Sequence, residues 1–495
     1  MKTVINGMIG SEHTLPINIH TFTVEEKVEW IGFVVHVTKK KWLGFLLWDS
    51  NDRLRAQYLS GKAPKEILLH ESAQQSSILT IPGEITKGEW RLEVVVADAS
   101  TPTKVTDIPY EIIIETGLGS SPFDSHIHKL GQCCWTTLEE QQLAFGNYDW
   151  ERSYCDETRW YKGDFHTHTI QSDGKMTPSA NVEQAQKNGL DFFVATDHHV
   201  MTTGWSSDEF LVLPGIEITS TKGHFNALGP KGWIDWRFYE HDGGMETEEG
   251  MNRVLQDTKQ VGALRSLNHP FLKPWHWAFQ ETKLEGFDCI EIWNDPTYQQ
   301  NTAATEDALH VWSVLWNEGY LLPGIGGSDS HLLPTESYKK NGPPSVIGDP
   351  ATYVFSNGLS ANEILHAVKK GRVYVSRGPV LDMYIKVGNE IKPLGTDLST
   401  YHGKQVEFVI NYENVKLGSQ LQFISKGEVV SHHVLEKEGQ VELPFQVTDE
   451  FGWYRIDIRD EQGELLAFSN PVYYGKRKRD IITWSQLLEK AGYQK

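Results

Sequence analysis

Residues 163–174 read GDFHTHTIQSDG and contain the first of several groups of metal-binding residue types. One residue separates His166 from His168, so in an extended segment their imidazoles point to the same side. Asp173 follows within SDG, a sequence that favours a turn. Two imidazoles and one carboxylate are therefore expected to lie close together.

The chain from residue 161 to 379 alternates predicted strands with predicted helices. Apolar runs at 190–195, 210–213, 216–219, 263–267, 287–293 and 321–325 predict strands, and helices fit 177–188, 246–260, 302–318 and 360–370. This alternation is typical of an α/β fold with a parallel sheet, open or closed into a barrel.

Further residues of the same types stand at the ends of these strands. They are Asp197 and His198 after 190–195, Glu217 in PGIE, His224 after Gly223, His269 in NHP after 263–267, and Asp329 and His331 in SDSH after 321–325. Side chains at the carboxyl ends of barrel strands converge at one mouth. We therefore expect all of these groups in a single pocket.

The number and type of these residues predict a catalytic metal site. A structural zinc site needs four ligands and usually uses cysteine, whereas this set mixes imidazoles with carboxylates and suits zinc, manganese or iron. The candidate ligands are His166, His168, Asp173, His198, Glu217, His224, His269, Asp329 and His331. This excess indicates two or three divalent cations with positions left for water and substrate, as in a hydrolase.

Composition excludes several classes of function. The chain has 495 residues and a formal net charge of −20, which argues against general binding to nucleic acid or to an anionic membrane. The sequence shows neither a secretory signal nor a membrane span, so we expect a cytoplasmic protein. The four cysteines form no disulfide or metal pattern and are expected to be reduced.

The flanking regions have a different pattern. Residues 1–115 carry short strands at 30–37, 43–48, 67–70, 77–81, 90–96 and 110–115, which predict an antiparallel β-sandwich or jelly roll. Residues 116–160 are interpreted as an ordered linker with one helix at 137–144, and residues 380–475 as a second β-sandwich. Residues 476–495 combine a basic run, interpreted as a solvated connection, with a short helix.

The motifs HxH, SDG, TDHH, PGIE, GH, NHP and GSDSH, in this order, resemble the PHP (polymerase and histidinol phosphatase) superfamily. The resemblance covers about residues 161–379. The segments GRVY (371–374), SRGP (376–379) and SNP (469–471) are similar to its CehA/McbA branch of metallohydrolases. The resemblance implies a distorted (β/α)7 barrel with a trinuclear metal site, here flanked by the two predicted sandwiches.

The resemblance also implies a distribution of ligands among the three cations. His166, His168, Glu217 and Asp329 would surround one metal, and Glu217 would bridge to a second held by His269 and His224. Asp173, His198 and His331 would hold the third. Asp197 would either orient a ligand or donate a proton to the leaving group.

Such a site implies hydrolysis by a hydroxide that bridges two cations, with a small phosphate ester as the preferred substrate class. Arg377, Arg265 and Lys222 are candidate clamps for the phosphate, and Arg377 is the one we assign to the catalytic set. The tryptophans at 275, 277 and 293 are candidates for the pocket wall. The sequence leaves the oligomeric state open.

Three alternatives remain open. Amidohydrolase barrels also begin with HxH but typically use a carboxylated lysine and a lone final aspartate, whereas this chain has Asp329-Ser330-His331. The same metal site could hydrolyse an ester, amide or carbamate. The protein could instead be a carbohydrate- or protein-binding module whose barrel is stabilised by metal.

The other histidines serve as internal comparisons. His126 and His128 repeat the HxH spacing without a following SDG, and His199 should point away from its neighbour His198. The remaining comparisons, expected to be structural, are His310, His366, His432 and His433.

Overall fold

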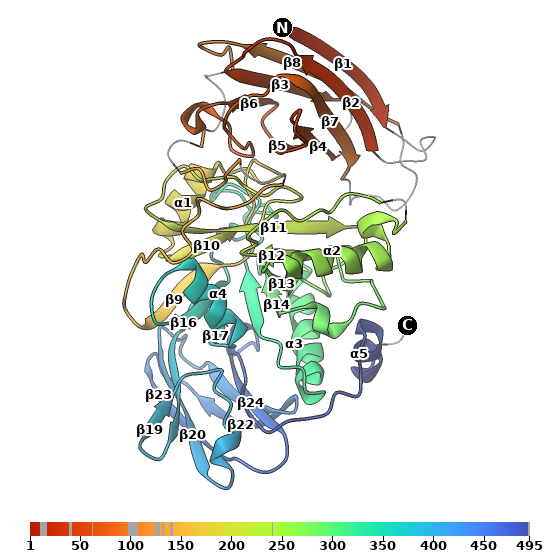
Figure 1. Cartoon of the computed structure of the whole chain (residues 1–495). Coiled ribbons are helices and arrows are strands. Elements are labelled where there is room, and N and C mark those ends of the chain that lie inside the picture. Colours follow the sequence, from red (N-terminus) through yellow and green to blue (C-terminus); the bar gives the residue numbers. More distant parts are fainter. Residues whose placement is uncertain are drawn as a thin grey trace.

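The computed structural model describes the chain except residues 10–16, 39–41, 62, 98–106, 124–128, 131–132, 139–141, 240 and 494–495. It is a mixed α/β structure with many strands and few helices. The N-terminal sheets lie at one end, the last sheets lie at the other, and the helices α1 to α4 surround the region between them (Figure 1). No helix in the described part of the chain is both long and apolar enough to span a membrane.

Two antiparallel four-stranded sheets form the N-terminal region. One contains β1 (Lys2–Ile9), β8 (Ile108–Gly117), β3 (Trp30–Val37) and β6 (Glu66–His70), and the other β2 (Ile17–Val24), β7 (Gly88–Val96), β4 (Leu43–Trp48) and β5 (Leu54–Leu59). Phe33 on the first sheet and Phe45 and Leu92 on the second belong to one buried cluster, as expected of a sandwich. The strand predicted at 77–81 is wrong, because those residues form turns and isolated bridges.

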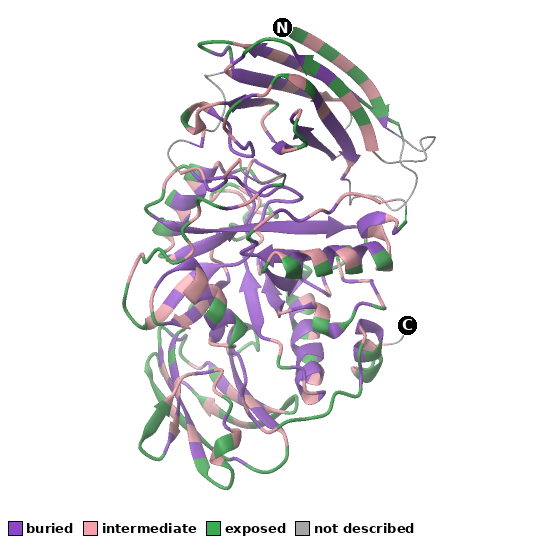
Figure 2. Cartoon of the chain, in the orientation of Figure 1, coloured by how far each residue is buried: buried purple, intermediate pink, exposed green. Residues whose placement is uncertain are grey.

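The middle of the chain supplies nine strands to one mixed sheet. These are β9 (Arg159–Asp164), β10 (Phe192–Ala195), β11 (Leu211–Ser220), β12 (Gly223–Leu228), β13 (Leu264–Leu267), β14 (Cys289–Asn294), β15 (Gly324–Gly327), β16 (Ala351–Ser356) and β17 (Val373–Ser376). The helices are α1 (Pro178–Lys187), α2 (Glu248–Gln260), α3 (Asn301–Asn317) and α4 (Ala361–Lys369). The strands of this region are largely buried, whereas α2 exposes one side to solvent (Figure 2).

The predicted (β/α)7 barrel is not confirmed by the strand pairing. β9, β10 and β11 are parallel, as are β13, β14 and β15, but β12 is antiparallel to both of its neighbours and β16 is antiparallel to β9. The sequence suggested two strands at 210–213 and 216–219, yet β11 runs through Pro214 and Gly215 without a turn. A tight turn at Thr221 and Lys222 then reverses the chain into β12, which the sequence pattern did not predict.

β15 is an edge strand that pairs with β14 on one side. On its other side, called the open side here, side chains and not a backbone ladder connect it to the rest of the sheet. Asn470 Nδ2 donates to the carbonyl of Gly324, and its Oδ1 accepts a hydrogen bond from the amide of the same residue. Thr352 Oγ1 makes the equivalent pair of bonds with Gly326. Beyond the end of β15, Thr167 and Ser330 form an isolated parallel bridge. The strand ends are therefore brought together although the sheet is not a closed ladder.

The last sheets extend from this framework. β18 (Val380–Val387), β19 (Glu390–Lys392), β20 (Gln405–Glu413) and β23 (Gly439–Gln446) form a separate sheet, whereas β21 (Gln420–Ser425), β22 (Glu428–Val434), β24 (Gly452–Arg459), β25 (Leu465–Ser469) and β26 (Val472–Tyr474) continue the mixed sheet through β17. Short 3-10 turns lie at Ala73–Gln75, Gly244–Glu246, Leu284–Gly286 and Ser399–Tyr401. The predicted domain limits at 115, 379 and 475 stay predictions.

Two connecting segments differ in how far they match the sequence interpretation. The helix predicted at 137–144 is wrong for the described residues, because Thr137 and Ala144 pair with each other as an antiparallel bridge. The basic run leads to α5 (Trp484–Lys490), which lies beside α3 (Figure 1). Arg477 and Arg479 form ion pairs with Glu318 and Glu285, so both guanidinium groups have acidic partners within the chain.

Candidate metal centre

All nine residues predicted as metal ligands lie in one cluster, in which Asp173, Asp329 and His331 are partly exposed and the other six are buried. They form four overlapping groups whose ligand atoms lie within 4.8 Å of one another in each group. The groups are His166, His168 and Glu217; His166, His269 and Asp329; Glu217, His224 and His269; and His168, Asp173, His198 and His331. The geometry therefore agrees with the predicted set, and the role of each side chain as a ligand stays a prediction.

Glu217, on β11, lies at the centre of the cluster. Its Oε1 is 3.3 Å from His166 Nε2 and 3.1 Å from His224 Nδ1, and its Oε2 is 3.5 Å from His168 Nε2 and 2.8 Å from His198 Nδ1. The two oxygens thus face different histidines. This arrangement suits a carboxylate that bridges two cations.

Asp329 lies beside both histidines of the HxH motif. Its Oδ1 lies 3.3 Å from His166 Nε2 and 3.0 Å from His168 Nε2. Asn294 Nδ2 donates to Oδ2 of the same carboxylate at 3.2 Å, which fixes its orientation. Asp329 and His269 both have left-handed backbone conformations, with φ values of 48° and 25°, and strain of this kind is common at functional sites.

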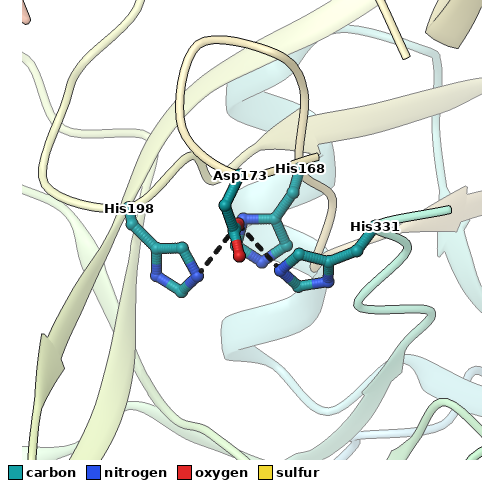
Figure 3. Close-up of side chains that lie close together, drawn as sticks. All are labelled: His168, Asp173, His198 and His331. Atoms are coloured by element: carbon teal, nitrogen blue, oxygen red, sulfur yellow. Dashed lines mark ion pairs between the residues drawn. The ribbon is translucent and has the colours of Figure 1, made fainter. Parts of the chain in front are cut away.

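The remaining group surrounds Asp173 (Figure 3). Asp173 Oδ1 is 3.0 Å from His331 Nε2 and 3.5 Å from His198 Nε2. His168 stacks on both imidazoles, with ring centroids 4.1 Å from His331 and 4.4 Å from His198. His168 therefore faces this group as well as Glu217 and Asp329, whereas the family pattern assigned it to only one metal.

Backbone contacts hold the HxH segment against the end of β15. Asp164 Oδ1 accepts hydrogen bonds from the amides of His166 and Ser328, and the amide of Asp329 donates to the carbonyl of His166. Gly327 lies directly beneath this contact, because a Cβ at that position would be 2.4 Å from the Cβ of His166. Only glycine allows the two segments to approach so closely.

The cluster fits bound cations on the evidence of its own polar atoms. His166 Nε2, His168 Nε2, His224 Nε2 and Glu217 Oε2 are buried and, despite the short distances between the charged groups, none of them makes a hydrogen bond of suitable geometry to the described residues. Such atoms are costly unless they are satisfied by a ligand, water or ion. Nitrogen and oxygen donors without thiolate suit zinc, manganese or iron, and the identity and number of the metals stay predictions.

The charged side chains of the cluster strongly shift one another's pKa values. Burial opposes a charge on His331, but Asp173 and Asp329 outweigh it and raise its pKa to about 10. Burial, together with the neighbouring His331 and His198, lowers the pKa of His168 to about 3. Burial opposes ionisation of Glu217, but the surrounding histidines hold its pKa well below the usual value. The carboxylates thus stay ionised, as metal binding requires.

Asp197 does not lie among the grouped ligand atoms. Its Oδ1 accepts hydrogen bonds from the Thr169 amide and the Ser172 hydroxyl, and its Oδ2 accepts one from the Thr169 hydroxyl. These bonds hold the turn that presents Asp173. Of the two roles expected for Asp197, the contacts favour orientation of a ligand over donation of a proton.

Glu291, on β14, was missed by the sequence interpretation. Its Oε1 lies 3.1 Å from His166 Nδ1, and its Oε2 accepts hydrogen bonds from the His269 amide and from Asn294. A carboxylate that contacts the outer nitrogen of a metal-ligating histidine orients the ring and increases its basicity. The available signal was a charged residue within an otherwise apolar strand, CIEIWN.

We expect Glu291→Gln to weaken metal binding by roughly 10- to 100-fold, because the substitution removes the charge that supports His166. Competition against a chelating dye would measure the change in affinity. Glu318→Gln is the matched control, since Glu318 is also buried but pairs with Arg477 and Lys490. Equal affinities of the two variants would rule out this role for Glu291.

A cavity of about 460 Å³ opens onto the cluster. Besides seven of the nine predicted ligands, its lining consists of Trp42, Thr219, Leu272, Trp275, Asn294, Asp295, Tyr298, Asn301, Leu332 and Tyr338. Trp275 is therefore part of the wall, as expected. The other two candidates are buried elsewhere: Trp277 packs on Phe279 and Phe287, and Trp293 belongs to the core.

None of the three predicted phosphate clamps is among the residues that line this cavity, and their role stays a prediction. Arg377 pairs with Asp349, with Nε 2.8 Å from Oδ1, and Arg265 pairs with Asp288, also at 2.8 Å. Lys222 lies over the ring of Phe279. Each of these cationic side chains thus interacts with a nearby acidic or aromatic group. The distance of a residue from a motif in the sequence does not reveal such a partner.

The comparison histidines lie apart from the grouped ligands. His199 is buried against Trp236, with its backbone in a left-handed conformation, and is absent from the four groups. His310, His366 and His432 are exposed, and His433 is partly buried on β22. His126 and His128 lie outside the described residues.

The chain shows similarity to known proteins at the level of solved structures. No family model and no curated protein matches it. One similar solved structure is a two-domain protein of Bacteroides vulgatus that contains a predicted PHP-like metal-dependent phosphoesterase; it is 18% identical, with 64% of this chain and 96% of that chain covered and a TM-score of 0.34.

A second similar structure, from Bifidobacterium adolescentis, is assigned as a metal-dependent phosphoesterase and is 17% identical. The similarity covers 42% of this chain and 94% of that chain, with a TM-score of 0.27. The resemblance of this chain to the PHP superfamily therefore rests on the ordered motifs and on the nine side chains that they bring together.

Proposed function

We propose that this protein is a PHP-type metal-dependent hydrolase that acts on small phosphate esters. The observation that carries the proposal is the cluster of nine nitrogen and oxygen ligands, which opens onto a cavity large enough for a small molecule. A binding module or spacer would not need so many buried ligands beside an open cavity.

The residues of the cluster fit two or three divalent cations, which when bound supply Lewis acidity and lower the pKa of water. Glu217 presents one oxygen to His166 and His224 and the other to His168 and His198, so it holds the groups together. Asn294 and Glu291 keep Asp329 and His166 oriented toward the centre. Preorganisation of this kind reduces the cost of reorganisation during the reaction.

A second candidate, hydrolysis of a carboxylic ester, amide or carbamate, is favoured by one observation. No lysine or arginine is present among the described residues that line the cavity, so neutralisation of a phosphate would depend on the cations alone. A neutral carbonyl substrate would not need such neutralisation.

A panel with one leaving group separates the two candidates. The protein loaded with zinc, manganese or iron(II) would be assayed on 4-nitrophenyl phosphate, 4-nitrophenyl acetate and a 4-nitrophenyl carbamate. We expect the highest kcat/KM for the phosphate. Preference for the acetate or carbamate would support the second candidate, and no metal-dependent turnover of any of them would contradict both.

Removal of metal is expected to abolish turnover and to lower the Tm. Cations that bind only the folded state stabilise it by about 2.7 kcal/mol at a concentration 100 times their Kd. Dialysis against a chelator, followed by calorimetry and re-addition of each metal, would measure both effects. An unchanged Tm together with full activity would contradict the presence of a catalytic metal centre.

A further inference from the structure

A second cavity, of about 360 Å³, lies within the N-terminal region and meets the first. It is lined by Val35, Val37, Thr38, Trp42, Tyr58, Ser60, Gly61, Ala63, Lys65 and Asp173. Trp42 and Asp173 line both cavities. The second cavity is therefore adjacent to the space in front of the metal centre, with Trp42 and Asp173 at the boundary.

Trp42 stands at the junction of the two cavities. Its ring centroid lies 4.8 Å from that of His198, and its carbonyl accepts a hydrogen bond from the amide of Ala97. Gly61 lies behind the indole with a φ of 138°, and a Cβ there would be 3.0 Å from Trp42 Nε1. The tryptophan thus has a fitted position beside a predicted ligand.

The N-terminal sheets are fixed to the region that carries the metal centre. The Gln57 side chain exchanges hydrogen bonds with the backbone of Met201, and the amide of Leu79 donates to Thr203 Oγ1. Trp48 and Trp233 pack edge to face with centroids 5.6 Å apart. Hydrophobic residues from both regions share one core, and this packing holds the second cavity beside the cluster.

The chemistry of the second cavity differs from that of the first. Val35, Val37 and Ala63 give it apolar walls, and Lys65 is the one lysine or arginine among the described residues that line either cavity. Lys65 is exposed to solvent. An apolar group that ends in an anion would match these walls and this cation.

We propose that the N-terminal sheets bind the leaving group of the substrate, an apolar alcohol that carries a terminal carboxylate, with Trp42 at the junction and Lys65 facing the carboxylate. This inference rests on the proposed function, because it takes the reacting ester to lie at the metal centre. It assigns a specificity-determining role to residues outside the predicted metal-binding region.

Phosphate and acetate esters of methanol, hexanol and 6-hydroxyhexanoate provide the test in the full-length, metal-loaded protein. We expect kcat/KM to rise by at least about tenfold from hexanol to 6-hydroxyhexanoate, and Lys65→Ala to remove that difference. Lys27→Ala, an exposed lysine that lines neither cavity, should preserve it. Trp42→Ala should reduce the advantage of hexanol over methanol.

Calorimetric binding of free 6-hydroxyhexanoate, compared with hexanol, keeps this test separate from the proposed function. Binding that Lys65→Ala weakens about tenfold would support the second cavity even if no ester were hydrolysed. If all the esters are hydrolysed with equal kcat/KM and free 6-hydroxyhexanoate does not bind, the inference is overturned and the proposed function remains intact. Trp42→Phe offers a conservative variant should Trp42→Ala fail to fold.

Discussion

Replacing Asp329 by alanine should lower turnover by roughly a thousandfold or more and release bound metal, because the carboxylate contacts two groups of the cluster at once. Its Oδ1 lies 3.3 Å from His166 Nε2 and 3.0 Å from His168 Nε2, and 3.5 Å from His331 Nδ1. Removal leaves these histidines without their shared negative partner. The cations that they hold would then lose both a ligand and the charge that offsets them.

Metal content by plasma emission, measured alongside turnover, tests this expectation. Asp329→Asn preserves the shape of the side chain and separates loss of charge from loss of packing. His166→Ala should resemble Asp329→Ala, whereas His366→Ala, at an exposed position on α4, should retain both metal and activity. A fully active Asp329→Ala protein with its normal metal content would exclude the proposed centre.

The cluster could be predicted from the sequence because each of its parts is local. His166 and His168 alternate in one segment, and His269, Asp329 and His331 follow directly after apolar runs that became β13 and β15. The position of a buried strand determines where its carboxyl end lies. The polar residues that directly follow the strand are therefore placed at that end. The spacing therefore carries the information that brings the nine side chains together.

The remaining features depend on contacts between distant segments. Glu291 meets His166 across 125 positions of the chain, and Trp42 reaches His198 from the N-terminal sheets. The Arg377 side chain pairs with Asp349, a residue that no motif includes. Neither periodicity nor motif spacing reports such pairs, because both describe neighbours in sequence.

The sheet topology was only partly predicted, because it too depends on contacts between segments that are distant in the sequence. Pro214 and Gly215 are typical turn residues, yet both lie within β11, where Gly215 allows close approach: a Cβ there would be 2.8 Å from the Ala195 carbonyl oxygen. The packing requirement for a small residue outweighs its turn propensity. The antiparallel β12 follows that continuous strand through a tight turn, a connection that the predicted alternation of strands and helices did not include.

Asn470→Ala should destabilise the protein by about 2 to 5 kcal/mol, because one side chain satisfies two buried backbone groups of β15. The Asn470 amide accepts from the Gly324 N–H at 2.8 Å and donates to the Gly324 carbonyl at 2.7 Å. Alanine would leave both groups buried without a partner on that side. The resulting gap lies on the strand that leads directly to Asp329 and His331.

Calorimetry on the metal-free and metal-loaded proteins would measure this effect as a fall in Tm of several degrees. Gln440→Ala removes an exposed amide that bonds to Asn411 and should change stability by no more than about 0.5 kcal/mol. If the two variants melt at the same temperature, Asn470 does not close the open side of β15. A larger fall in Tm for the metal-loaded protein than for the metal-free protein would show that Asn470 also supports the cation sites. The reason is that bound metal stabilises the folded protein only as far as the cluster is intact.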